Sequence, residues 1–218
     1  MPAQQVLNIK WLNALNAKKV ILASSSPRRK DILSQLGIKY TVLASTFPET
    51  LDKSLFNHPS DYVKENALQK ALEVYERLKA TGHTPDLVIG ADTVVAHNSQ
   101  ILEKPRSEQD AIEMLTSLSG STHMVYTGVT LIAPPIDGSD NPRILIDVEG
   151  TEVRMQNLSR ELIEAYVETK EPMDKAGAYG YQTTGCLLVK GINGCSWNVI
   201  GLPASKLFFM LEEFTAQE

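Results

Sequence analysis

Basic and hydroxyl side chains are concentrated in the segment SSSPRRK at residues 24–30. Residues 19–23, of which residues 20–23 are apolar, come just before it and predict a buried strand, while Pro27 suits the first position of a helix. Free N–H groups at a helix start favour anions, and the forked guanidinium groups of Arg28 and Arg29 match phosphate oxygens. The segment therefore predicts an anion site, although a serine cap followed by a solvated basic turn would give the same pattern.

The tetrapeptide GADT at residues 90–93 overlaps the end of a second expected strand, residues 86–91, in which residues 87–89 are apolar. We expect a strand to end there and to present Asp92 and Thr93 at its carboxyl end. A carboxylate in that position could bind a divalent metal or orient a water molecule. Gly90 would let the backbone pass close to a ligand. An aspartate that merely caps a turn is the alternative interpretation.

Two later segments combine charged and small residues. The tripeptide EKP fixes Lys104 just before a proline, a signal that taken alone also fits a surface lysine. The segment EPMDKAGAYGYQ at residues 171–182 surrounds Asp174, Lys175 and Gln182 with glycines and alanines. Such a loop allows a ligand to approach the backbone closely, with polar groups pointing inward. A purely structural loop is the alternative.

The elements that must position these residues alternate between strand-like and helix-like patterns, which predicts an α/β fold. No internal repeat and no clean interdomain linker interrupts the pattern, so we expect one unit with a mixed twisted sheet and flanking helices in two lobes around a cleft. The expected strands cover residues 19–23, 39–44, 86–91, 101–102, 122–133, 143–155 and 185–192. The expected helices begin at Pro27, Ser60, Ser107, Ser159 and Pro203, and a breaker-rich loop covers residues 134–142.

Charge is distributed unevenly along the 218 residues, whose net charge is −5. Residues 1–30 carry six bases and no acid, so the remaining residues carry 15 bases against 26 acids. An acidic body is a poor ligand for long nucleic acids, but a local basic patch can still hold a small polyanion. The apolar runs are far shorter than the roughly 20 residues that a membrane span requires, which argues against a membrane protein.

Cysteine usage points to a reducing compartment. Cys186 and Cys195 are the two cysteines, and neither has a zinc-like spacing to the four histidines. The N-terminal residues also lack an uninterrupted apolar signal segment. We therefore expect a cytoplasmic protein.

Six motifs in order resemble those of the Maf family of nucleoside triphosphate pyrophosphatases. They run from about Val20 to Phe209 and read SSSPRR, GADT, EKP, LSGSTHMVYTGV, EPMDKAGAYGYQ and GLP. The resemblance implies a fold related to the inosine triphosphate pyrophosphatases and a homodimer. It also implies hydrolysis of a nucleoside triphosphate to the monophosphate and pyrophosphate with a divalent cation, Mg²⁺ or Mn²⁺.

Carried onto this chain, the resemblance makes Asp92 the catalytic base and, together with Glu49, a metal ligand. Cleavage between the α- and β-phosphates places negative charge on the pyrophosphate, so nearby cations would stabilise the transition state. Lys104 belongs with Asp92 in the expected catalytic set. The residues expected to bind the substrate are Ser24, Arg28, Arg29, Lys70, Thr93, Lys175 and Gln182.

Gln182 bears on the choice of substrate. A glutamine at this place in the family marks the subgroup that acts on dTTP and UTP, and a glutamate marks one that acts on 7-methyl-GTP. An amide offers one acceptor and one donor, which match N3–H and O4 of uracil or thymine. A rotated amide would pair with cytosine, so CTP stays open, as do a purine triphosphate and a nucleotide-binding regulator of cell division without turnover.

The resemblance also sets the expected domain boundary. Residues 1–18 should form an N-terminal extension and residues 19–218 a single catalytic domain, so deleting residues 1–17 is expected to leave activity nearly intact. Two further positions depart from the family pattern. Pro48 precedes Glu49 where many relatives have two acids, and Tyr181 stands beside Gln182 where an aliphatic residue is more frequent.

Overall fold

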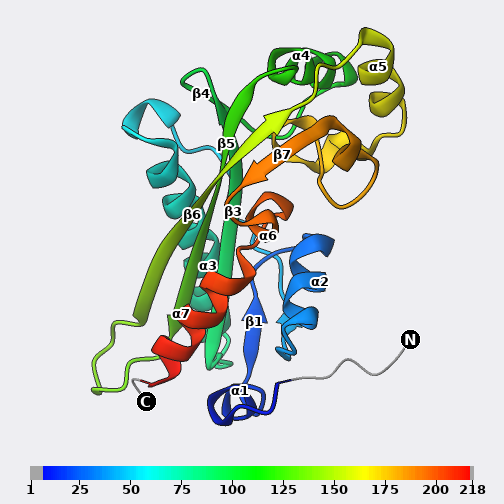
Figure 1. Cartoon of the computed structure of the whole chain (residues 1–218). Helices are drawn as coiled ribbons and strands as arrows, with labels where there is room; N and C mark the ends of the chain where they lie inside the picture. The colour runs from blue at the N-terminus through cyan, green and yellow to red at the C-terminus, as the bar shows by residue number, and fades with distance from the viewer. Residues whose placement is uncertain (1–6, 217–218) are drawn as a thin grey trace.

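A mixed sheet runs through the whole molecule, which a computed structural model describes over residues 7–216 (Figure 1). The strand order is β2-β1-β3-β5-β6-β7, and β4 pairs with β3. β1 is parallel to β2 and β3, whereas the other pairs are antiparallel. The strands are β1 Val20–Leu22, β2 Thr41–Val42, β3 Leu87–His97, β4 Gln100–Leu102, β5 Thr122–Ala133, β6 Arg143–Met155 and β7 Val189–Asn193. The expected α/β class is confirmed.

Helices flank both faces of this sheet. They are α1 Lys10–Leu15, α2 Pro27–Gln35, α3 Pro59–Ala80, α4 Glu108–Leu118, α5 Arg160–Glu168, α6 Ser196–Ile200 and α7 Ala204–Ala216. Short 3-10 turns cover Lys53–Leu55, Glu171–Asp174, Ala176–Ala178 and Thr184–Leu188. The expected caps hold at α4 and α5, where Ser107 and Ser159 accept backbone N–H bonds. At α3 the cap is His58 rather than Ser60.

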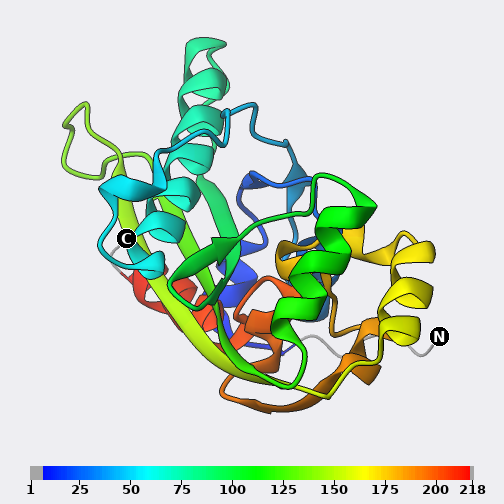
Figure 2. The same cartoon turned by 90° about the horizontal axis from the view of Figure 1, so that it is seen from above.

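Alternating strand residues separate the helices into two layers. Ile21 of β1 and Val88 of β3 pack against α3, whereas their neighbours Leu22 and Ile89 join a core with α1, α2 and α7. This alternation is the period of two that every strand imposes on its side chains. Figure 2 shows α3 and α7 on opposite sides of the sheet.

A second core lies at the other end of the long strands. Val95 of β3, Val125 of β5 and Val153 of β6 pack there against α4, α5 and the segment around Tyr179. Because β3, β5 and β6 extend through both cores, they connect two lobes into one folded unit.

Glycines bring α3 unusually close to the sheet. A Cβ atom at Gly90 would lie 2.5 Å from the carbonyl oxygen of Ala67, and one at Gly128 would lie 2.6 Å from that of Val63. Gly90 therefore serves the approach of a helix rather than that of a ligand, which corrects the sequence-based interpretation. The approach fixes where Lys70, one turn after Ala67, meets the sheet.

Three sequence-based boundaries are wrong. β3 does not end before Asp92 but continues to His97, because β5 pairs with it from Val88 to Ala96. The strand expected at residues 185–192 begins with a 3-10 turn and becomes extended only at Val189. The strand expected at residues 39–44 shrinks to two residues.

The N-terminal segment is part of the packing. Leu12 and Leu15 of α1 are fully buried in the core that holds α7, and the Trp11 ring lies 4.7 Å from that of Phe208. The expectation that residues 1–17 are dispensable overlooks these contacts. Within residues 7–216, no helix combines the length and the apolar character needed to cross a bilayer.

Candidate active site

A cavity of about 480 Å³ lies where the two lobes meet. The loop after β1, the middle of β3, the segment after β4 and residues 174–181 all contribute to its wall. Nine of the ten candidate residues line it, namely Ser24, Arg28, Arg29, Glu49, Lys70, Asp92, Thr93, Lys104 and Lys175. The structure thus brings together side chains from six separate stretches of sequence. Gln182, the tenth candidate, is exposed and is not part of this wall.

β3 provides the floor of the cavity because its partners change along its length. β1 pairs with it over Leu87–Ile89 and β4 over Val95–His97, which leaves residues 90–94 between the two strands. Consecutive residues of a strand point to opposite faces. Asp92 accordingly faces Lys70 of α3, while Thr93 faces Arg29 of α2.

Lys70 joins the two candidate carboxylates. Its Nζ lies 2.7 Å from Oδ1 of Asp92 and 2.9 Å from Oε2 of Glu49. The side chains of Lys70 and Asp92 are each 10% exposed, whereas that of Glu49 is 51% exposed. Asp92 is therefore held in a fixed orientation at the floor of the cavity. Glu49 contacts Lys70 from the more open loop between β2 and α3.

Arg29 is a partly buried cation whose direct hydrogen-bond partners are all neutral. Its Nε donates to the carbonyl oxygen of Gly201 at 2.9 Å, and its two terminal nitrogens donate to the hydroxyl groups of Ser24 and Thr93 at 3.1 Å. Burial lowers the pKa of Arg29, and the charge of Asp92 opposes this effect. A guanidinium nevertheless keeps its proton in proteins, so this wall carries a positive charge that favours an anionic ligand.

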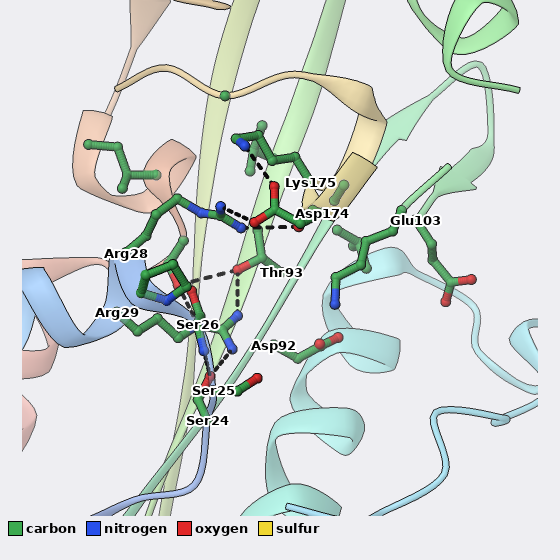
Figure 3. A pocket seen from close by; sticks show the side chains of 18 of the residues that line it. Ser24, Ser25, Ser26, Arg28, Arg29, Asp92, Thr93, Glu103, Asp174 and Lys175 are labelled. Atoms are coloured by element: carbon green, nitrogen blue, oxygen red, sulfur yellow. Dashed lines mark hydrogen bonds and ion pairs between the residues drawn. The ribbon is translucent and has the colours of Figure 1, made fainter. Parts of the chain in front are cut away.

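Arg28 of α2 and Lys175, the sequence neighbour of Asp174, both contact the Asp174 carboxylate (Figure 3). Nη1 of Arg28 lies 2.8 Å from Oδ2 of Asp174, and Nζ of Lys175 lies 2.6 Å from Oδ1 of the same residue. Burial alone would raise the pKa of Asp174, but the hydrogen bonds from Lys175 and Arg28 lower it overall. The pair between Arg28 and Asp174 joins the start of α2 to the other lobe.

Residues 19–214 match the family model described as Maf-like protein. The chain belongs to the Maf family. It is 46% identical over 197 residues to a dTTP/UTP pyrophosphatase of Clostridium perfringens, covering 90% of this chain and 97% of that relative. It is 44% identical over 199 residues to a dTTP/UTP pyrophosphatase of Bacillus cereus, covering 91% of each.

A human relative is much longer. The chain is 47% identical over 188 residues to a probable bifunctional dTTP/UTP pyrophosphatase/methyltransferase protein of Homo sapiens, covering 85% of this chain and 30% of that relative. Among solved structures, the dITP/XTP pyrophosphatase of Mycobacterium abscessus is similar with a TM-score of 0.38 and 13% identity over 92% of this chain and 97% of that one. The family assignment therefore rests on the sequence matches and not on this structural similarity.

The site of this Maf protein contains residues that the sequence alone did not single out. Glu103 lines the cavity beside Lys104, and its carboxylate accepts hydrogen bonds from Tyr62 at 2.6 Å and Lys53 at 2.7 Å. Burial alone would raise the pKa of Glu103, but these two hydrogen bonds lower it overall. Tyr62 and Lys70 are eight residues apart on α3, a spacing that places both on one helix face and could have indicated their common role.

The donors available for a metal ion are few. Across residues 7–216, no group of three or more histidine, cysteine, aspartate and glutamate side chains is arranged to hold a metal. Mg²⁺, however, usually binds through one or two carboxylates together with substrate phosphates. Asp92 and Glu49, which both reach Nζ of Lys70, supply oxygen donors of that number and kind.

Proposed function

We propose that this Maf protein is a nucleoside triphosphate pyrophosphatase that hydrolyses dTTP and UTP to the monophosphate and pyrophosphate. The observation that carries the proposal is one cavity in which Arg28, Arg29, Lys104 and Lys175 surround the pair of Lys70 and Asp92. This arrangement supports binding of a polyanion beside a carboxylate that can act on water. The names of the relatives from Clostridium perfringens and Bacillus cereus support the choice of pyrimidine nucleotides.

In the proposed reaction, a water molecule attacks the α-phosphorus while the bond from that phosphorus to the bridging oxygen breaks. Asp92 orients this water and accepts its proton, and pyrophosphate leaves with the electron pair of the broken bond. Lys70 fixes the orientation of the Asp92 carboxylate through its 2.7 Å contact. Lys104 and Arg29 stabilise the negative charge that develops on the leaving group.

The proposal includes a divalent cation, Mg²⁺ or Mn²⁺, held by Asp92 and Glu49 with the substrate phosphates. When bound, such an ion would lower the pKa of a coordinated water and offset phosphate charge. Glu49 is half exposed and Asp92 nearly buried, so Asp92 would hold the ion at the floor of the cavity and Glu49 at its more open side.

A panel of nucleoside triphosphates tests the proposal. Pyrophosphate release is measured with dTTP, UTP, CTP, ATP, GTP and 7-methyl-GTP, each with Mg²⁺ and with Mn²⁺. We expect the highest kcat/KM for dTTP and UTP. Preference for CTP or for a purine nucleotide would overturn the substrate assignment, and binding of UTP without turnover on any nucleotide would instead support a regulatory binding protein.

The role of Asp92 has its own test. Asp92→Asn keeps the shape of the side chain but removes its basicity, so we expect kcat to fall by at least about 100-fold, in the usual range for acid–base groups. UTP binding measured by calorimetry should persist. Asp140→Asn, in the exposed loop between β5 and β6, is the matched control and should behave as wild type. Unchanged turnover in Asp92→Asn would show that another group activates the water.

We extend the proposal to the setting of the enzyme. A cytoplasmic location is supported by Cys186 and Cys195, both free thiols. A homodimer is proposed from the family resemblance, and light scattering on the purified protein would test it.

A further inference from the structure

Tyr181 belongs to the cavity wall, next to Gln182, the residue that the sequence analysis had expected to bind the base. Tyr181 lines the cavity and is half-buried, whereas Gln182 is exposed and lies outside the wall. Gly180, which precedes them, packs tightly on Lys175, since a Cβ atom there would lie 2.4 Å from Cε of the lysine. Through Gly180, the backbone of Tyr181 is therefore adjacent to the part of the wall that Lys175 forms.

The loop that carries Tyr181 is fixed on both sides. The phenol oxygen of Tyr166 accepts from the backbone N–H of Gly180 at 3.2 Å. Oε1 of Glu171 accepts from that phenol at 2.9 Å, from the backbone N–H of Gly185 at 3.2 Å and from the hydroxyl of Thr183. One carboxylate oxygen thus ties three points around Tyr181 and sets which side of the loop faces the cavity.

Gly185 allows the loop to close this tightly. A Cβ atom at this position would lie 2.2 Å from the carbonyl oxygen of Gly180 and 2.5 Å from the phenol oxygen of Tyr166. The two ends of the segment from Gly180 to Gly185 are therefore in contact. Closure of this kind restricts the backbone of the segment that carries Tyr181.

Two other aromatic residues line the cavity, and each has a different position. The phenol of Tyr179 lies 2.7 Å from Nε2 of His123, and only 5% of Tyr179 is exposed. Phe47 belongs to the loop of Glu49, on the side of the proposed metal and phosphates. Tyr181 is thus the half-buried aromatic residue of the cavity wall that follows Gly180, which itself packs on Lys175.

We infer that Tyr181 is a substrate-binding residue whose ring packs against the base of the nucleotide. The inference rests on the proposed function, in which the α-phosphate lies at Asp92 and the other two phosphates lie at Lys104, at Arg29 and at the cation that Glu49 would help to hold. The sugar and base then occupy the remaining part of the cavity, toward Tyr181. Every base has a π-face that can stack on an aromatic side chain, and a tyrosine keeps a hydroxyl group for solvent or the base edge.

The test compares UTP with a ligand that has no base. KM and kcat for UTP, and the inhibition constant of inorganic tripolyphosphate, are measured for wild type, Tyr181→Leu and Tyr181→Phe. The leucine removes the ring and should raise KM for UTP about 10-fold, within the range for base–aromatic stacking. It should leave kcat and the inhibition constant of tripolyphosphate unchanged. The phenylalanine keeps the ring and is the matched control, with KM close to wild type.

Other outcomes would overturn the inference. An unchanged KM in Tyr181→Leu would show that the ring does not contact the base. A parallel rise in KM and in the inhibition constant of tripolyphosphate would show a general disturbance of the cavity. If wild type hydrolyses no nucleotide, the proposed function fails by itself, and calorimetric binding of UTP and tripolyphosphate to the same variants still decides the role of Tyr181. Tyr181→Met replaces the leucine variant if that variant does not fold.

Discussion

At the residue scale, one lysine and one arginine of the cavity show how the same positive charge serves different purposes. Lys70 contacts two carboxylates, so its positive charge is compensated within the protein. Arg29 is partly buried and donates only to neutral acceptors, so its charge is available to a ligand. The sequence analysis placed both residues among those expected to bind the substrate. Their different partners become visible only when segments far apart in the chain are brought together.

His123 makes a pH-dependent contribution to stability. Burial, followed by the charge of His97, whose ring centroid is 6.5 Å away, lowers the pKa of His123 to about 4. In the unfolded chain the pKa is about 6.5. Between these values the unfolded chain binds a proton that the folded protein does not, so stability falls as the pH decreases. From pH 7 to pH 5 we expect His123 to reduce the free energy of unfolding by about 2 kcal/mol.

Urea denaturation of wild type and His123→Gln at pH 7 and pH 5 measures this contribution. The variant removes the titrating ring, so its stability should depend less on pH by about that amount. His83→Gln is the matched control because His83 is exposed, and it should keep the wild-type dependence. Equal slopes for wild type and His123→Gln would contradict the prediction.

At the scale of elements, the contact between α3 and β3 determines where Lys70 meets Asp92. Gly90→Ala adds a Cβ atom that would lie 2.5 Å from the carbonyl oxygen of Ala67 and 2.7 Å from Cβ of Ala71. Overpacking of this kind typically costs about 1–3 kcal/mol. Because Lys70 lies between these two alanines, the helix shift should also lower kcat. Thermal melting and steady-state pyrophosphate release check the two effects.

Gly82→Ala is the control for this prediction. Gly82 follows the end of α3 with φ of +72° and has no atom within 4 Å of the position of an added Cβ. The substitution should cost stability through backbone strain, about 1–3 kcal/mol, without changing kcat. A Gly90→Ala variant with wild-type kcat would show that α3 adjusts without moving Lys70.

The sequence predicted most elements because their hydrophobic period and caps are local signals. Strands β5 and β6 have the expected bounds, and the expected serines are the N-cap residues of α4 and α5. The sequence-based prediction ended β3 too early. The residues that extend β3 past Asp92 pair with β5, which lies about 30 residues further along the chain. The outer position of Gln182 likewise depends on the hydrogen bonds of Glu171, which no local pattern indicates.

At the scale of the whole molecule, three long strands extend through two hydrophobic cores. The N-terminal helix α1 completes the core that contains α7. Leu12 and Leu15 of α1 are buried with Leu207 and Leu211 of α7. The family match begins only at residue 19, so this packing lies outside the part of the chain that the resemblance covers. The position of α1 therefore could not be inferred from the family motifs.

The burial of α1 leads to a prediction that differs from the one made on sequence alone. Leu12→Ala removes a fully buried side chain and should lower the free energy of unfolding by about 2–5 kcal/mol. Deleting residues 1–17 should cost at least as much, because it also removes Leu15 and the contact between Trp11 and Phe208. Lys10→Ala, an exposed position on the same helix, is the matched control. Chemical denaturation measures all three, and a deletion variant as stable as wild type would show that α1 only covers a core that is complete without it.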